Sequence, residues 1–591
     1  MQRKIAVLVI TSILALLAGF VPEIATTEFF YQNLSWFFML VIALSAVASF
    51  WGLARQINWS EGLARHKPVL LGSLLLVGCA ALLSPPDFRV LADETNLLGV
   101  SFEMHRGMKT RLPLEGLYYY HGMFEGLTYK TEMRPPGYPF LLSLLHGITG
   151  YRSGNALALN LGLAWLSLVL THFLVSGFAG KRWGWAAMLL LAAFPAFVQS
   201  ACSAGFEIYN LFLVLLLLLM IAKMLEGRVG SAPVISVLLL LAFSRYESIV
   251  GLICFVPLIL FLQTHVAAEQ CSAEGPDNSG NSGNSGNSGN SKTAWHSFVW
   301  AFPLLLVPAL WLRRLTFNTG SFQVQNLDDA FAAANFLPNA AGWLKYFTLP
   351  EFSGFVGPII LAVAVIGLLL RLKEMASCKG NIRMKIFESS AGAFFLLHLL
   401  IRLFYTQGNP MNPYTARLVV VMLPCLVFLA IAAAVRVASL QKRSVDAAAR
   451  LSAVVIVFAG LLLITSWPAA SGSRGTNNLA LYREFKWVRQ QLARLNVGEE
   501  SILICPRPPM YIPLGYSAIG PAYLTANAAK ITKMLEICAY DRLVFVEAID
   551  YKVARSNMPS LPVEMSGLKA EVLFETQMTG SEKLKITSFT R

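Results

Sequence analysis

Two adjacent carboxylates, Asp93 and Glu94, are the residues of this chain whose type and position point most directly to chemistry. They follow an apolar segment, residues 68–84, and begin a long polar stretch that ends at Arg134. A carboxylate where a membrane span meets water can serve as a base, a metal ligand or an anchor for a cation. The same pair also occurs in ordinary polar loops, so its meaning depends on the rest of the chain.

Other charged residues stand at the ends of apolar segments. Glu207 begins one such segment, and Arg417 begins a late one. Arg245 lies in a turn between two others, and Arg134 closes the polar stretch. An ionisable group at membrane depth costs about 3 kcal/mol on insertion scales, so it is tolerated mainly where it pairs or lines a polar cavity. We therefore expect these four side chains to converge with Asp93 in one cavity.

Ordinary explanations compete with this interpretation. Arg245 can simply pair with Glu247, its near neighbour in sequence. Arg402 and Arg417 can extend along their apolar stems to the membrane surface, and for Arg402 we favour that explanation. Glu207 is harder to explain in this way, because an acidic side chain is too short to reach the surface from within a span.

Composition places the chain in a membrane. It has 591 residues, of which 56% are hydrophobic and 14% charged, and its mean hydropathy is +0.58. Soluble domains have about 25% charged residues. The net charge of +14 raises the question of a nucleic-acid partner. However, Lys and Arg cluster in short loops on alternate sides of the apolar segments, which is the positive-inside pattern, so we expect no nucleic acid and a polytopic α-helical membrane protein.

Hydropathy predicts about 13 transmembrane helices. They cover, in order, residues 5–21, 34–53, 69–84, 155–178, 184–200, 205–224, 231–244, 248–264, 297–312, 353–370, 387–404, 417–436 and 450–467. We interpret the first as an uncleaved span. With the N-terminus inside, the positive-inside bias places the Asp93 loop and the C-terminal segment on the outer face.

Six segments organise the chain. They are N-terminal transmembrane helices (1–84), an outer catalytic loop with interfacial helices (85–153), transmembrane helices (154–264), a flexible cytoplasmic linker (265–296), transmembrane helices (297–473) and an extracytoplasmic α/β domain (474–591). The linker contains an Asn-Ser-Gly repeat, residues 278–291, which cannot bury apolar surface. In the outer loop, residues 113–120 suggest short helices at the interface.

The C-terminal segment has the patterns of a small α/β domain. Residues 479–495 have helical periodicity. Four short runs rich in β-branched residues predict strands, at 501–505, 542–546, 570–574 and 583–587. Cys505 and Cys538 both lie here, and a disulfide between them is left open.

These motifs carry a family resemblance. An apolar span followed by Asp93 and Glu94, and then by Arg-Pro-Pro-Gly-Tyr-Pro at 134–139, resembles the GT-C superfamily of polyprenyl-phosphate-sugar-dependent glycosyltransferases. Its members include protein O-mannosyltransferases and the lipid A aminoarabinose transferase. Glu207 is similar to the second acidic position of the superfamily, and Arg417 to its Arg-Tyr element. The resemblance covers roughly residues 69–436.

The resemblance implies transfer of a sugar from a polyprenyl phosphate to an acceptor hydroxyl, with inversion at the anomeric carbon. Asp93 would be the base and Glu94 would assist binding or orientation. Guanidinium groups suit a leaving phosphate, because they stay charged and bind its oxygens in a forked geometry. The substrate-binding residues implied are Arg134, Tyr138, Glu207, Arg245 and Arg417.

Three arginines can supply the positive charge that a leaving phosphate needs, so we expect no required cofactor. A divalent metal held by Asp93 and Glu207 is left open. The expected partners are the lipid-linked sugar donor, membrane lipids, and a glycolipid, lipopolysaccharide or protein acceptor. The expected location is the bacterial inner membrane, with the active site and C-terminus extracytoplasmic. The alternative is a lipid or glycolipid transporter or flippase without transferase activity, against which the charges at span ends argue.

Overall fold

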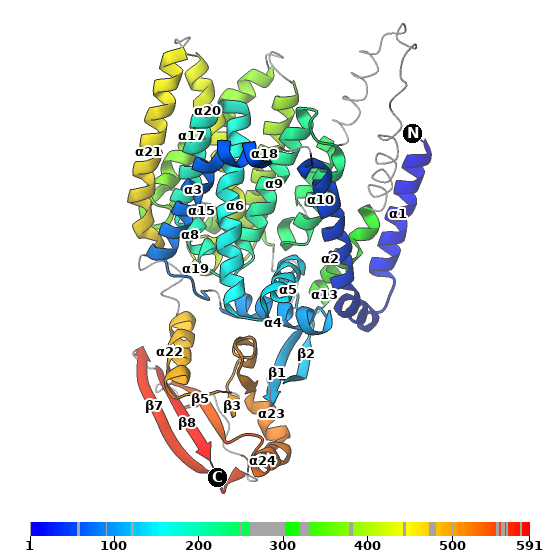
Figure 1. Ribbon diagram of the computed structural model, residues 1–591, viewed down its shortest axis with the longest axis vertical. Helices are drawn as coiled ribbons and strands as arrows, with labels where there is room; N and C mark the ends of the chain where they lie inside the picture. Colours follow the sequence, from blue (N-terminus) through cyan, green and yellow to red (C-terminus); the bar gives the residue numbers. More distant parts are fainter. Residues whose placement is uncertain are drawn as a thin grey trace.

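The computed structural model consists of a large helical bundle with a smaller α/β domain at one end (Figure 1). It describes residues 2–55, 59–89, 91–119, 123–248, 250–259, 302–318, 331–376, 382–440, 445–471, 480–498, 500–550, 555–556, 562, 565–579 and 582–590. The predicted linker, including its Asn-Ser-Gly repeat, lies outside the described residues.

Apolar helices build the bundle. Their bounds are α1 Gln2–Phe20, α2 Ile24–Ala54, α3 Trp59–Leu83, α6 Gly154–Ala179, α7 Lys181–Ala193, α8 Pro195–Ala201, α9 Glu207–Leu225, α10 Ser231–Ala242, α13 Val307–Asn318, α15 Phe336–Thr348, α16 Pro350–Ser353, α17 Val356–Ala376, α18 Ile382–Phe404, α19 Pro413–Ala416, α20 Leu423–Leu440 and α21 Val445–Ser471. A 3₁₀ helix, η4 (Arg417–Met422), leads into α20. Long apolar helices are the expected solution in lipid, because every backbone polar group must be satisfied within the segment.

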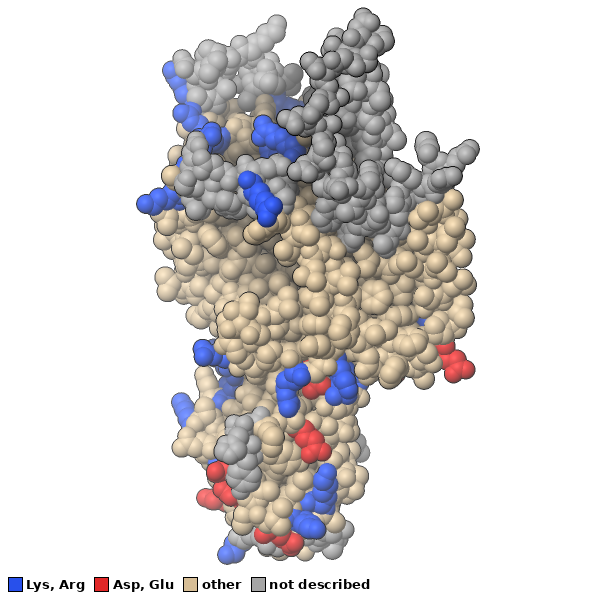
Figure 2. Space-filling model, turned by 45° about the vertical axis from the view of Figure 1, so that its right-hand side comes forward, with Lys and Arg blue, Asp and Glu red and all other residues tan. Residues whose placement is uncertain are grey.

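Among the described residues, fewer helices than expected have the length and composition needed to cross a membrane. Within the described residues, seven helices are long and apolar enough to cross a membrane, or eight if the bent pair α7 and α8 is one span. The expected count of about 13 is therefore not confirmed. Shorter apolar helices, such as α10, lie at several of the other expected positions. On the face that Figure 2 shows, a broad band without Lys, Arg, Asp or Glu crosses the bundle, as lipid contact requires.

The bend between α7 and α8 replaces a single expected span at 184–200. The two helices meet at 75°, and Phe194 between them is extended. Pro195 has no backbone N–H to continue the hydrogen bonding of α7, so a new helix begins there. This break directs the chain into the turn before α9, where Glu207 stands.

The segment between α3 and α6 connects the bundle to the α/β domain. It forms α4 (Leu91–Gly107), a hairpin of β1 (Leu112–Tyr119) and β2 (Met123–Lys130), and α5 (Gly137–Thr149). The expectation of short helices at 113–120 is wrong, because residues 113–119 are in β1. Their strand is stabilised by pairing with the C-terminal domain, where Gly116 lies opposite Ala518.

One sheet combines this hairpin with the C-terminal strands. Its order is β2-β1-β4-β3-β5-β8-β7, with β6 (Arg555–Ser556) against β5. The C-terminal strands and helices are β3 Ser501–Ile504, β4 Ser517–Ile519, β5 Arg542–Asp550, β7 Lys569–Thr579, β8 Glu582–Thr590, α22 Ala480–Arg494, α23 Pro521–Ala526 and α24 Ala528–Glu536. The predicted helix and all four predicted strands are confirmed. Cys505 is buried and Cys538 exposed, and both are free thiols, so no disulfide joins them.

Candidate active site

Asp93 lies in the first turn of α4, between two arginines that are far apart in sequence. Its Oδ1 accepts a hydrogen bond from Nη2 of Arg134, and its Oδ2 accepts one from Nη2 of Arg417. The Asp93 side chain is 20% exposed. Both carboxylate oxygens are thus engaged by separate guanidinium groups, and the predicted convergence of Asp93, Arg134 and Arg417 is observed.

Local structure at η4 orients Arg417. Asn412 caps the short helix α19 by accepting a hydrogen bond from the N–H of Tyr414 at 3.0 Å, and Pro413 occupies the first helical position. The Arg417 Nε then donates to the carbonyl of Tyr414 at 2.9 Å. These contacts leave the two terminal nitrogens of Arg417 to contact carboxylates.

Glu207 connects Arg417 to a third arginine. Its Oε1 lies 3.0 Å from Nη1 of Arg417 and accepts a hydrogen bond from Nη1 of Arg245 at 2.9 Å. The Glu207 side chain is only 2% exposed. A Cβ on Gly205 would lie 2.2 Å from the Glu207 Oε2, so the glycine leaves room for this carboxylate. Glu207 therefore positions two arginines from inside the protein.

Three further residues extend the contacts and were not predicted as site residues. Arg402 donates to Glu247 Oε1, which also accepts from Arg245 Nε at 2.9 Å. The explanation of Arg402 as a surface-reaching side chain is wrong, because it is 5% exposed and faces a carboxylate. At the other end, Glu132 accepts from Nη1 of Arg134. In the sequence, the signal that could have identified these residues was their charge near the ends of apolar segments.

Together these side chains form one continuous charge network. In spatial order it consists of Glu132, Arg134, Asp93, Arg417, Glu207, Arg245, Glu247 and Arg402. Four carboxylates alternate with four guanidinium groups, so the network carries no net charge when all are ionised. Buried ion pairs recover their desolvation cost poorly and are weak evidence of stability alone. A network of this length is better explained by function.

Two buried asparagines hold the turns that carry the network. Asn160 donates to the carbonyls of Ser203 and Gly205 at 2.6 and 2.7 Å, directly before Glu207. Asn210, one helical turn after Glu207, donates to the Ser244 hydroxyl at 2.5 Å. Both amides are fully buried. They fix the two turns relative to α6 and α9, and so fix the carboxylate and arginine that those turns present.

Glu94 and Tyr138 point into the protein. Glu94 is 1% exposed, and its Oε2 accepts from the backbone N–H of Arg89 at 2.6 Å, which supports the start of α4. Tyr138 is fully buried, and its hydroxyl donates to the carbonyl of Ala156 at 3.4 Å. Beside it, the Gly137 N–H donates to Phe243 O at 2.9 Å, and a Cβ there would come within 2.5 Å of that oxygen.

The charges around Asp93 decide its proton affinity. Burial by itself raises the pKa of this carboxyl, but Arg417 and Arg134 outweigh burial and hold the pKa below its ordinary value. Asp93 is therefore ionised at neutral pH. While both guanidinium groups contact it, however, it is a weak base.

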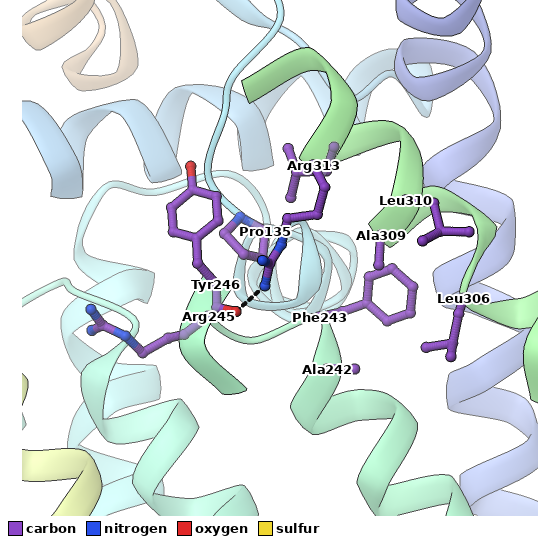
Figure 3. A pocket seen from close by; sticks show the side chains of 10 residues that line it. Pro135, Ala242, Phe243, Arg245, Tyr246, Leu306, Ala309, Leu310 and Arg313 are labelled. Carbon is purple, nitrogen blue, oxygen red and sulfur yellow. Dashed lines mark hydrogen bonds between the residues drawn. The ribbon is translucent and has the colours of Figure 1, made fainter. Parts of the chain in front are cut away.

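An apolar pocket lies next to the network (Figure 3). Phe243, Leu306 and Leu310 form its apolar side, and Arg245 and Arg313 are among its lining residues. Figure 3 shows Arg313 reaching from α13 to the carbonyl of Tyr246, to which it donates a hydrogen bond. Within the described parts of the chain, no carboxylate lies within ion-pair distance of Arg313. A cationic group beside apolar walls suits a ligand with an anionic head and a hydrocarbon chain.

The described residues contain no group of three or more His, Cys, Asp or Glu side chains placed to hold a metal ion. Asp93 and Glu207, which we considered as metal ligands, both contact guanidinium groups in this structure.

No protein-family model and no curated protein sequence matches the chain. Solved structures do match it. The chain is similar in fold to ArnT from Cupriavidus metallidurans bound to undecaprenyl phosphate. The identity is 12% over 89% of this chain and 98% of that one, with a TM-score of 0.48.

A second similar structure is the oligosaccharyltransferase of Archaeoglobus fulgidus in its apo form. Here the identity is 12% over 83% of this chain and 70% of that one, and the TM-score is 0.44. At 12% identity and with TM-scores below 0.5, these likenesses carry no argument about function, so we base the function on the site.

Proposed function

We propose that this protein is an integral membrane glycosyltransferase that moves a sugar from a polyprenyl-phosphate donor to an acceptor hydroxyl on the extracytoplasmic face. The observation that carries this proposal is the position of Asp93 between Arg134 and Arg417. A carboxylate and fixed guanidinium groups within one buried site are the parts that such a reaction needs.

The donor has two chemical parts, and the site offers a match for each. Arg134, Arg245 and Arg417 present guanidinium groups for the phosphate. The pocket beside Arg245 presents Phe243 and Leu310 for isoprene units. An anion and a hydrocarbon chain thus find complementary surfaces next to one another.

The reaction balances as a single displacement. Asp93 takes the proton of the acceptor hydroxyl, and the acceptor oxygen forms a bond to the anomeric carbon. The bond from that carbon to the phosphate oxygen breaks, and its electron pair stays on the phosphate. The arginines stabilise the charge that develops there, which is often the largest catalytic contribution. Attack opposite the leaving phosphate inverts the anomeric carbon.

A transfer assay tests the proposal. Full-length protein in nanodiscs would receive polyprenyl-phosphate donors carrying a labelled sugar, with envelope glycolipids and glycoproteins as acceptors. We expect labelled product with the wild type, and none with Asp93→Asn, which keeps the size of the side chain. Glu103→Gln, on the same helix α4 but paired with Arg111 outside the network, is the matched control and should keep activity.

The transporter alternative predicts a different outcome of the same assay. A flippase would move the labelled lipid between leaflets without forming product. Product formation by the Asp93→Asn variant at the wild-type rate would remove Asp93 as the base.

A further inference from the structure

The charge network is already neutral before any donor arrives, and Asp93 has no free carboxylate oxygen. Four carboxylates oppose four guanidinium groups along it. Arg134 and Arg417, the two arginines that hold Asp93, are also two of those that face the leaving phosphate in the proposed function. The base and the leaving group must therefore share the same cations.

We propose that Asp93 is a masked base, which the donor phosphate uncovers by taking Arg134 and Arg417 from it. This inference rests on the proposed function and adds an order to it, in which the donor binds before the acceptor is deprotonated. Without donor, the two guanidinium groups occupy both Asp93 oxygens and suppress proton abstraction.

The charge balance of the reaction supports this sharing. A donor phosphodiester carries one negative charge, and Asp93 carries another. After transfer, Asp93 holds the acceptor proton and is neutral, while the released polyprenyl phosphate monoester carries the additional charge. One negative charge has thus moved from Asp93 to the phosphate, and Arg134 and Arg417 can follow it without any change in the net charge of the site.

The neighbouring contacts allow this movement and limit it. Glu132 holds Nη1 of Arg134, while only Nη2 of that arginine contacts Asp93. Glu207 lies beside Nη1 of Arg417, and again Nη2 contacts Asp93. Each arginine therefore has an anchoring carboxylate that remains in place when its other nitrogen turns to a phosphate oxygen.

The masked base makes an unusual prediction for Asp93→Asn. Asn has the shape of a protonated Asp, carries no charge and accepts only through its oxygen, so at least one of the two guanidinium nitrogens loses its partner, as in the state after transfer. This inactive variant should bind undecaprenyl phosphate at least ~10-fold more tightly than the wild type, because charge-assisted hydrogen bonds released from Asp93 become available. Binding of undecaprenyl phosphate to full-length wild type and Asp93→Asn in nanodiscs gives the two dissociation constants to compare.

Controls separate this inference from the proposed function. Glu103→Gln removes a carboxylate of α4 outside the network and should bind like the wild type. Equal affinity of wild type and Asp93→Asn, with a folded variant by size exclusion, overturns the masked base and leaves the proposed function intact. Equal tightening by Glu103→Gln also overturns it, since net charge alone would then explain the effect. Absence of undecaprenyl phosphate binding by every variant contradicts the proposed function itself.

Discussion

At the scale of single residues, the site is a set of carboxylates and arginines whose partners lie far away in sequence. Arg134 and Arg417 are separated by hundreds of residues and meet at Asp93. Arginine suits this position better than lysine, because its planar group can bind one carboxylate with each terminal nitrogen. The roles of these residues can be separated by their effects on donor and acceptor.

Arg417→Ala should weaken donor binding more than acceptor binding. Loss of a charge-assisted contact to phosphate raises the dissociation constant of undecaprenyl phosphate at least ~10-fold. The KM for the acceptor should stay near that of the wild type. Arg111→Ala, which breaks the Arg111–Glu103 pair outside the network, is the control. An Arg417→Ala variant with unchanged donor affinity would count against the phosphate role.

His146 on α5 should make stability depend on pH. Its Nδ1 lies 2.9 Å from the Asn155 amide nitrogen and its Nε2 3.3 Å from the Ser101 hydroxyl. Burial lowers the pKa of His146 from 6.5 to about 4. The unfolded chain therefore takes up a proton below pH 6.5 while the folded chain does not, and stability falls between pH 6.5 and about 4.

The melting temperature measured across that pH range tests this effect. His146→Gln should flatten the decrease, whereas His105→Gln at a more exposed position should not. A wild-type melting temperature that stays constant from pH 6.5 to 4 would contradict a buried neutral His146.

At the scale of elements, helix ends and turns deliver the charged residues to one place. Glu207 begins α9, Arg417 begins η4 and Arg402 lies near the end of α18. All of these ends face the side of the bundle where α4 lies. Non-helical backbone is tolerated where it is buried in protein or lines a polar cavity, so a polar site can form at these helix ends.

Gly205→Ala should disturb the site without replacing any charged residue. The added Cβ would lie 2.2 Å from Glu207 Oε2 and would rotate the carboxylate that holds Arg245 and Arg417. A displacement of about 1 Å at catalytic groups costs about 100-fold in rate, so kcat should fall by that order. Gly154→Ala at the start of α6, where a Cβ meets nothing within 4 Å, should leave the transfer rate unchanged. Equal rates for the two variants would contradict the role of the turn.

The elements were predictable where local patterns dominate. Apolar periodicity predicted the helices of the bundle, and β-branched runs predicted β3, β5, β7 and β8. The hairpin of β1 and β2 was missed, because β1 pairs with β4 about 400 residues later and no local signal reveals that partner. The same reason explains Arg402, whose partner Glu247 is distant in sequence. Arg313, which faces the pocket, was also missed, because a single arginine within a short helix has no distinctive pattern.

At the scale of the whole molecule, the C-terminal domain supports the loop that leads to Asp93. Asp87 accepts from the Tyr482 hydroxyl and from Arg489 of α22, both at 3.0 Å. The hydroxyl of Tyr118 in β1 donates to Ile512 O at 2.8 Å. Figure 1 shows α4 lying between the bundle and this domain. These contacts link the C-terminal domain to the segments on either side of α4, which carries Asp93.

Asp87→Asn should loosen that connection. Removing the charge weakens the contacts with Arg489 and Tyr482, and a partly exposed pair of this kind is worth about 1 kcal/mol or less. We expect a small decrease in melting temperature but a clear decrease in kcat, because α4 loses a support near Asp93. Glu226→Gln, which breaks an exposed pair with Lys223 at the end of α9, serves as the control. An Asp87→Asn variant with wild-type kcat would indicate that the C-terminal domain does not position α4.

The most direct test is an experimental structure of the full-length protein in nanodiscs with undecaprenyl phosphate. We predict the phosphate against Arg134 and Arg417, with Asp93 beside it and Glu207 still holding Arg417. A map with Asp93 remote from both arginines, or with the phosphate at a different end of the bundle, would contradict a glycosyltransferase site built on this network.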